Sequence, residues 1–153
     1  MRDTRNGNTR PRTISSTRLS QSPADQLGTA FRRLNAAFTG ALKPHGLTPL
    51  DANIVMILWV DGSMRVGMLQ KRLAINSSTF TGALDRLEKA GFIERKPAPG
   101  DRRATILEPL RLADSRQADI EAVLLDTEDL FFSGLTTSEQ KELARLLHKV
   151  TSV

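Results

Sequence analysis

The sequence predicts a mainly α-helical fold that carries one small β-hairpin. Apolar residues recur every three or four positions through most of the chain, which is the period of an amphipathic helix. Signals for helix starts and stops punctuate this pattern, and only two short segments between residues 92 and 107 have the composition of strands. With 153 residues, of which 39% are hydrophobic, the chain is long enough for one domain with a buried core.

The sequence predicts two consecutive helices, over residues 21–47 and 48–61. The first begins with Ser22 as cap and Pro23 at the first helical position, and it ends near Gly46, where glycine acts as a terminator. The second begins at Thr48, with Asp51 at its third position, and runs to about Val60. Its apolar residues cover most of the circumference, so we expect this helix to be buried on more than one side.

The next two helices are short and joined by a tight turn. Val66, Leu69 and Leu73 form one side of the first. In residues 77–90 an apolar face is opposed by small polar and basic residues; the apolar set is Phe80, Ala83, Leu84 and Leu87. This arrangement is typical of a helix-turn-helix, in which small side chains allow close approach to base edges and cations reach phosphates.

A predicted β-hairpin follows directly, after Gly91 ends the helix. Residues 92–96 form the first strand, 97–101 the turn and 105–107 the returning strand, so Arg102 and Arg103 lie at or near the tip as a basic wing. A long amphipathic helix is expected over residues 112–132. A last helix begins at the capping box of Thr136 and Glu139. The apolar face of the long helix contains Ile120, Val123, Leu124, Leu130 and Phe131.

Positive charge is concentrated in the middle of the chain. Residues 65–103 carry nine Lys and Arg against four Asp and Glu, whereas residues 104–153 carry five against nine. This distribution indicates that the middle segment meets a polyanion. Residues 1–20 carry five Arg against one Asp with almost no apolar content, and they predict a disordered basic leader.

Composition argues against several classes of protein. The chain has no cysteine and only two histidines, so it has no thiolate metal site, and nothing in it assembles a catalytic centre; we expect neither enzyme activity nor a cofactor or metal. No apolar run approaches ~18 residues and no secretory signal is present, which predicts a cytoplasmic protein with no membrane partner.

Over residues 23–150 the chain resembles the MarR family of bacterial winged-helix transcriptional regulators. Four motifs carry the resemblance: Gly46-Leu47-Thr48, Val66-Gly67-x-Leu69-x-Lys71-Arg72-Leu73, Ser77-x-Thr79-x-Thr81-x-x-Leu84-Asp85-Arg86-Leu87-Glu88-x-x-Gly91-x-Ile93-x-Arg95, and Gly100-Asp101-Arg102-Arg103. The resemblance implies a homodimer held by N-terminal (21–47) and C-terminal (111–153) dimerisation helices. A winged helix-turn-helix lobe (48–110) would read a near-palindromic DNA operator, most often as a ligand-responsive repressor.

Three positions depart from the family pattern. Arg65 stands where Ser or Thr usually caps the third helix, and it offers a cation that could reach a phosphate instead. Gln70 replaces a small Ala, and its amide must point outward or find a partner because burying it unpaired costs ~1–3 kcal/mol. Pro109 cannot donate a ladder hydrogen bond, so the second wing strand is expected to end by Glu108.

The predicted DNA-binding residues lie on the second short helix, on the wing and at Arg65. We expect Ser77 to cap its helix and donate to a phosphate. Asp85 either accepts from a cytosine amine or orients Arg86, and we favour the second. The resemblance implies that Arg103 enters the minor groove while Asp101 holds its guanidinium. Helix capping and a solvated surface are the alternative for each residue. The full set is Arg65, Ser77, Ser78, Thr79, Thr81, Asp85, Arg86, Arg95, Lys96, Asp101, Arg102 and Arg103.

A small aromatic or lipophilic effector is a further partner that the resemblance implies. Its candidate binding residues are Arg32, Phe38, His45, Met56 and Trp59, although aromatic and Met side chains at helical spacing are more often core. The alternative function, from a different class, is a winged-helix protein-interaction module with little or no specific DNA binding.

Overall fold

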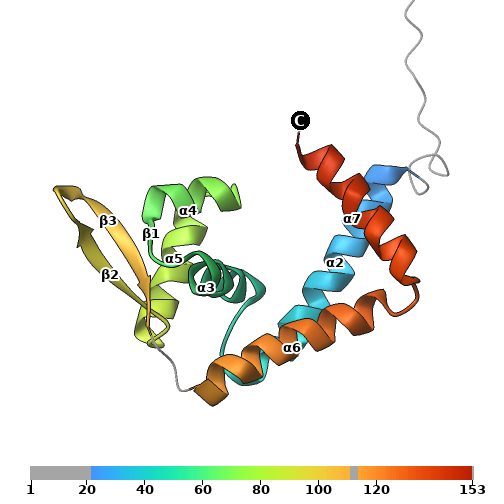
Figure 1. Cartoon of the computed structure of the whole chain (residues 1–153), viewed down its shortest axis with the longest axis horizontal. Helices are drawn as coiled ribbons and strands as arrows, with labels where there is room; N and C mark the ends of the chain where they lie inside the picture. Colours follow the sequence, from blue (N-terminus) through green and yellow to red (C-terminus); the bar gives the residue numbers. More distant parts are fainter. Residues whose placement is uncertain (1–21, 111–113, 153) are drawn as a thin grey trace, which may run out of the picture. The chain divides into compact units, whose positions relative to one another are not determined.

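The computed structural model describes residues 22–110 and 114–152, without the side chains of residues 102, 103, 114 and 115. Its elements are α2 (Pro23–Leu42), a 3-10 turn η1 (Lys43–His45), α3 (Pro49–Asp61), β1 (Met64–Arg65), α4 (Val66–Leu73), α5 (Ser77–Lys89), β2 (Ile93–Ala98), β3 (Asp101–Pro109), α6 (Asp114–Phe132) and α7 (Thr137–Thr151) (Figure 1). The predicted fold class, mainly α with a small β wing, is confirmed. The predicted leader, residues 1–20, lies outside the described residues.

The chain divides into two compact units at the Arg33–Leu34 boundary, inside α2. Of the first unit the structure describes residues 22–33. There the cap predicted at Ser22 is present, because its Oγ accepts the Asp25 N–H at 3.1 Å. The second unit, Leu34–Val153, contains the helix-turn-helix, the sheet and the two C-terminal helices.

Local capping signals account for the turn before α3 and for the first residues of this helix. Thr48 Oγ1 accepts the Asp51 N–H at 3.2 Å, and Asp51 Oδ2 accepts the Thr48 N–H at 3.0 Å, which completes a capping box with Pro49 at the first helical position. Gly46, with φ of 71°, adopts the left-handed conformation that terminates the preceding turn. Both boundaries agree with the sequence prediction.

The N-cap of α5 differs from the sequence prediction. Asn76, rather than Ser77, is the N-cap of α5, and its Oδ1 accepts the Thr79 N–H at 2.8 Å. Ser77 is left as the first helical residue, and its Oγ accepts a hydrogen bond from Gln70 Nε2 at 2.8 Å. Gln70 therefore has the partner that its amide required, and it ties α4 to the start of α5.

The β structure is a three-stranded antiparallel sheet of order β1-β3-β2, larger than the predicted hairpin. β1 is only two residues long and pairs Met64 with Leu107. The prediction that β3 ends by Glu108 is wrong by one residue, since Pro109 lies in the strand opposite Ile93. Leu110 N–H donates to the Phe92 carbonyl at 2.9 Å, so Ile93 and Pro109 form a non-hydrogen-bonded pair. The missing N–H of Pro109 is not needed at such a position.

One buried cluster holds the second unit together. It combines residues of α3, α4, α5 and the sheet with Leu42 of α2 and Ile120 of α6. Val123 and Leu124 pack against it as predicted, but Leu130 is 77% exposed and does not belong to the buried face of α6. Among the helices of residues 22–110 and 114–152, none combines the length and apolar character that crossing a membrane requires.

Candidate nucleic-acid interface

The exposed face of α5 carries the small polar side chains that the sequence singled out. Ser77, Ser78, Thr79 and Thr81 are all exposed, while the opposite face is fully buried through Phe80, Ala83, Leu84 and Leu87. Ser78 Oγ is oriented by Asn76 Oδ1 at 2.9 Å. The helix is thus anchored by its apolar side, and its exposed side carries short side chains that can form hydrogen bonds.

Arg86 is held by a residue that sequence reasoning treated only as a helix cap. Its Nη2 donates to Asp51 Oδ1 at 2.8 Å and its Nε to Oδ2 at 3.3 Å, across 35 residues of sequence. Asp51 is 1% exposed, whereas the Arg86 side chain is 54% exposed. A buried acidic residue at position N3 of a helix was the available signal, but nothing local indicates which cation it meets.

Arg95 joins the wing to α5. Its Nη2 donates to Asp85 Oδ1 at 2.7 Å, and its Nη1 donates to Glu88 Oε2 at 2.8 Å. Glu88 also accepts the Arg95 backbone N–H at 3.2 Å. The expectation that Asp85 orients Arg86 is therefore wrong: Asp85 pairs with Arg95, because β2 begins four residues after α5 and passes beside its last turns.

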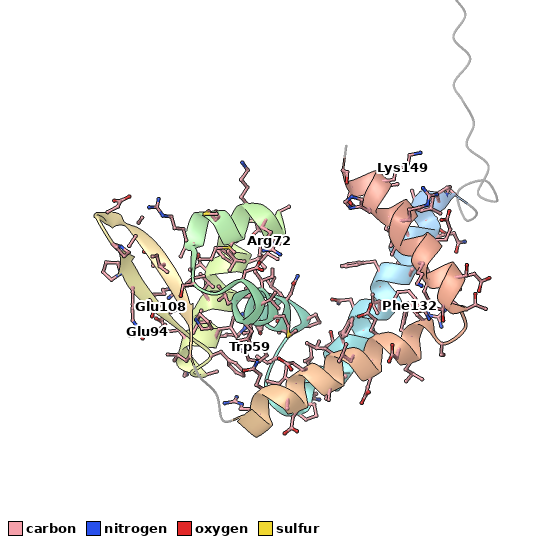
Figure 2. All side chains as sticks on the ribbon, viewed as in Figure 1. Trp59, Arg72, Glu94, Glu108, Phe132 and Lys149 are labelled. Atoms are coloured by element: carbon pink, nitrogen blue, oxygen red, sulfur yellow. The ribbon has the colours of Figure 1, made fainter. Side chains whose placement is uncertain are left out.

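Lys96 is also engaged with carboxylates. Glu94 and Glu108 lie directly opposite each other on β2 and β3, an unfavourable like-charge pair (Figure 2). Lys96 Nζ lies 2.5 Å from Glu108 Oε2 and 3.2 Å from Glu94 Oε2. The hydrogen bond to Glu108, followed by that to Glu94, raises the pKa of Lys96 above its ordinary value. This cation offsets the repulsion between the two glutamates.

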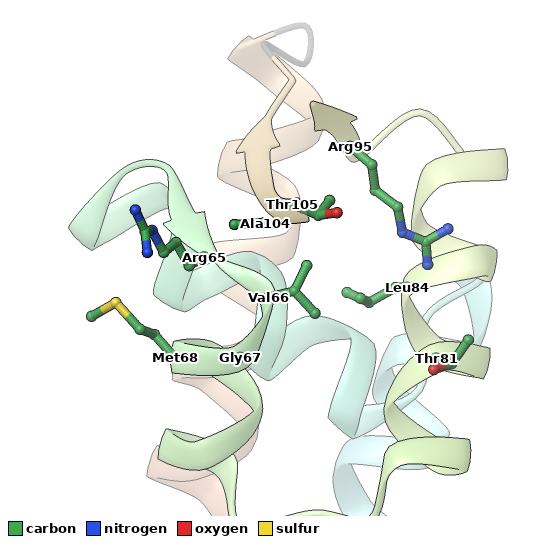
Figure 3. Close-up of a pocket in the computed structure, with 9 residues that line it drawn as sticks. All are labelled: Arg65, Val66, Gly67, Met68, Thr81, Leu84, Arg95, Ala104 and Thr105. Carbon is green, nitrogen blue, oxygen red and sulfur yellow. The ribbon is translucent and has the colours of Figure 1, made fainter. Parts of the chain in front are cut away.

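An open pocket of about 670 Å³ lies between the start of α4, α5 and the two wing strands (Figure 3). Val66 and Leu84 point toward each other at its floor, and Arg95 reaches from β2 toward α5. The remaining lining residues are Arg65, Gly67, Met68, Thr81, Ala104 and Thr105. Arg65 is exposed and gives α4 no side-chain cap, as its residue type implied.

The wing turns at Pro99 and Gly100, and Gly100 has φ of 77°. Ala98 pairs with Asp101 across this turn, so residues 101–103 begin β3 rather than forming the turn itself. The side chains of Arg102 and Arg103 lie outside the described residues. Their DNA contacts, and the role of Asp101 beside them, stay predictions.

The five candidate effector residues lie on three elements. Phe38 and Trp59 pack, partly buried, against the core cluster, and Met56 and His45 are half-buried. Arg32 is exposed and its Nη2 donates to Thr29 Oγ1 of the same helix at 2.9 Å. The Trp59 indole Nε1 is buried with no hydrogen-bond partner among the described residues. An unpaired buried donor favours a polar ligand atom at this position, but the effector site stays a prediction.

Residues 47–105 match the model of the MarR family. Over this segment the chain is similar to the MarR family. The matched segment begins two residues before α3 and ends in β3, so it contains the helix-turn-helix and most of the wing.

Relatives and solved structures agree with this assignment. The regulator YcgE of Bacillus subtilis is 35% identical over 95 residues, which are 62% of this chain and 60% of YcgE. A probable transcriptional regulator from Pseudomonas aeruginosa matches with a TM-score of 0.77 and 26% identity, covering 87% of this chain and 99% of that one. A mutant MarR from E. coli, solved in complex with operator DNA, has the same fold (TM-score 0.70, 23% identity, 83% and 91% covered).

Proposed function

We propose that this chain is a sequence-specific DNA-binding transcriptional regulator of the MarR type, which works as a homodimer and represses its target genes. The observation that carries the proposal is the exposed polar face of α5 beside the open pocket bounded by α4 and the wing. A helix whose exposed side chains are short and polar fits the major groove, which is wide enough to admit it. The pocket beside it leaves room for one sugar-phosphate strand.

The lining of the pocket suits a nucleic-acid backbone. Arg65 lines the pocket next to the N-terminal turn of α4, where Gly67 is exposed and adds no side chain. Helix N-termini favour anions, and phosphate contacts of this kind fix the register of a protein on DNA. A MarR mutant from E. coli with the same fold was solved in complex with operator DNA, which is consistent with DNA as the partner proposed here.

A near-palindromic operator requires two recognition helices related by symmetry, which is the reason for proposing a dimer. Two recognition helices entering successive major grooves on one side of the duplex have centres ~34 Å apart, or about 10 base pairs. We infer that a small effector bound near Trp59 changes this spacing and releases the DNA.

Selection from a random-sequence duplex library tests the proposal directly. Purified protein is expected to enrich a near-palindrome with half-sites about 10 base pairs apart, and a mobility-shift assay on the selected duplex should show binding that weakens steeply with salt. Arg103→Ala is expected to cut affinity for that duplex without lowering the melting temperature. Unchanged binding by this variant would contradict the wing assignment.

A protein-interaction module remains the alternative, and one observation favours it. Four carboxylates, those of Asp85, Glu88, Glu94 and Glu108, neutralise cations on the face that would meet DNA. If no sequence is enriched over bulk competitor DNA, and binding is insensitive to salt, this alternative replaces the regulator proposal.

A further inference from the structure

We propose that Asp51 is a positioning residue for DNA binding, which fixes Arg86 as a clamp on a backbone phosphate and prevents it from acting as a base reader. The inference rests on the proposed function and adds a role that the α5 surface alone does not reveal. It concerns two residues from different elements, Asp51 of α3 and Arg86 of α5, whose side chains form an ion pair.

The carboxylate of Asp51 is fixed on every side that the structure describes. Its Oδ2 accepts the Thr48 N–H at 3.0 Å as part of the capping box, and both oxygens accept from Arg86. The residue is 1% exposed. Its position is therefore set by the first turn of α3, not by the side-chain freedom of an exposed acid.

Arg86 cannot leave this partner when DNA binds. The Asp51 carboxylate is buried, so withdrawing the guanidinium would leave a buried charge with only the Thr48 N–H among its described partners, which is unfavourable. The guanidinium must therefore act from where Asp51 holds it. A base-reading arginine needs a side chain free to extend to the guanine edge, and the tether to Asp51 removes that freedom.

The part of Arg86 that remains available faces the surface of α5. Nε and one N–H of Nη2 donate to Asp51, which leaves the second N–H of Nη2 and the two N–H groups of Nη1. Nη1 lies 3.7 Å from the point where a Cβ of Gly82 would be, so it rests along the helix one turn before Arg86. With 54% of the side chain exposed, this fixed donor is accessible to a phosphate beside the groove.

The added positive charge and the loss of positioning change DNA affinity in opposite directions in Asp51→Asn. The direction of the measured change therefore decides between them. Removing the carboxylate raises the net charge by one, and charge alone would strengthen binding to any duplex. Loss of positioning weakens binding in spite of that added charge. We expect Asp51→Asn to weaken binding about tenfold, and Arg86→Gln to weaken it by a similar factor, as for loss of one charge-assisted hydrogen bond.

The experiment uses two duplexes: one selected from a random library by the wild-type protein, and a scrambled version of it. Both variants are expected to lose affinity for the two duplexes by the same factor, because a phosphate contact carries no sequence information. The double variant should bind no more weakly than either single variant. This non-additivity would show that Asp51 acts through Arg86.

Controls separate the proposal from loss of folding. Thr48→Ala removes the other half of the capping box and leaves the ion pair, so it should lower the melting temperature without changing affinity. Arg86→Lys keeps the charge on an exposed side chain but cannot reproduce the planar two-point contact, and it should weaken binding even if Asp51→Asn does not fold.

Three results would overturn the inference. Stronger binding by Asp51→Asn would mean that Asp51 only reduces the charge of the surface. A selective loss on the selected duplex in Arg86→Gln would make Arg86 a base reader. Wild-type affinity in both Arg86 variants would leave the pair a purely structural contact. Failure of the wild-type protein to select any sequence would instead refute the proposed function, before any variant is measured.

Discussion

Ala74 is the one non-glycine residue of the described chain with a positive φ, at 51°. It ends α4 in the left-handed conformation, where its Cβ costs ~1–2 kcal/mol, and its N–H bonds the Lys71 carbonyl. Glycine removes that cost but loses ~0.4–1 kcal/mol through the entropy of the unfolded chain.

We therefore expect Ala74→Gly to stabilise the protein by about 0.5–1 kcal/mol, raising the melting temperature by ~1–4 °C. Thermal unfolding at matched protein concentration measures this. Gly substitution at Ala90, which ends α5 with a negative φ, is the control and should destabilise. A fall in the melting temperature of Ala74→Gly would show that the turn is not strained.

Arg95 provides a second test at the scale of single residues. Because its guanidinium is bonded to Asp85 and Glu88, we expect Arg95→Met to destabilise the protein by about 1 kcal/mol and to weaken DNA binding through a misplaced wing. The slope of log affinity against log salt should stay unchanged, since no phosphate contact is lost.

Lys89→Met, which removes an exposed cation at the end of α5, is the matched control for charge and should leave the melting temperature unaltered. A decrease of ~0.9 in the salt slope of Arg95→Met would show that Arg95 contacts a phosphate directly.

At the scale of elements, helix ends were predictable and sheet pairing was not. The N-cap at Thr48, with Asp51 at N3, and the capping box of Thr136 with Glu139 form as predicted, because each depends on side chains three residues apart. β1 was missed because two residues have no strand periodicity. Its existence depends on β3, which lies more than forty residues later along the chain.

The cap of α7 predicts a specific pH dependence. Hydrogen bonds from the Thr136 backbone and then its hydroxyl lower the pKa of Glu139 below its ordinary 4.5. A carboxylate with a depressed folded-state pKa stabilises above its ordinary pKa, and that stability is lost as pH falls through the folded value. Glu139→Gln should therefore reduce stability at pH 7 and make its decline below about pH 4.5 shallower.

Urea unfolding at pH 7, 4 and 3 measures the effect, with Glu128→Gln on α6 as the matched exposed carboxylate. Parallel acid declines for wild type and Glu139→Gln would mean that the capping box contributes nothing in solution.

At the scale of the whole molecule, exposed apolar side chains gather on the terminal helices. Val150 is 68% exposed and Leu130 is 77% exposed, and larger sets of exposed apolar side chains mark interaction surfaces. The set on α2, α6 and α7 is Leu27, Phe31, Leu125, Leu130, Leu146, Leu147 and Val150. These side chains fit the proposed dimer, in which a second copy would cover them.

Leu146→Glu with Val150→Glu is therefore expected to convert the dimer to a monomer and to lower operator affinity more than a hundredfold, because one lobe reads only a half-site. Light scattering coupled to size exclusion measures the mass. Val60→Glu, which charges an equally exposed apolar residue of α3, should leave the dimer intact. A monomeric wild-type protein would contradict the proposal.

By itself the sequence determined the helices, their caps, the position of the wing and the polar face of α5, because these follow from residue spacing over a few positions. Only the tertiary structure decided which charges meet. Asp51 and Arg86 are 35 residues apart, and Asp85 pairs with Arg95 and not with its neighbour Arg86. Such pairs depend on the packing of α3 and β2 against α5, and a carboxylate that could pair with several cations is assigned to one of them only when the backbone has been placed.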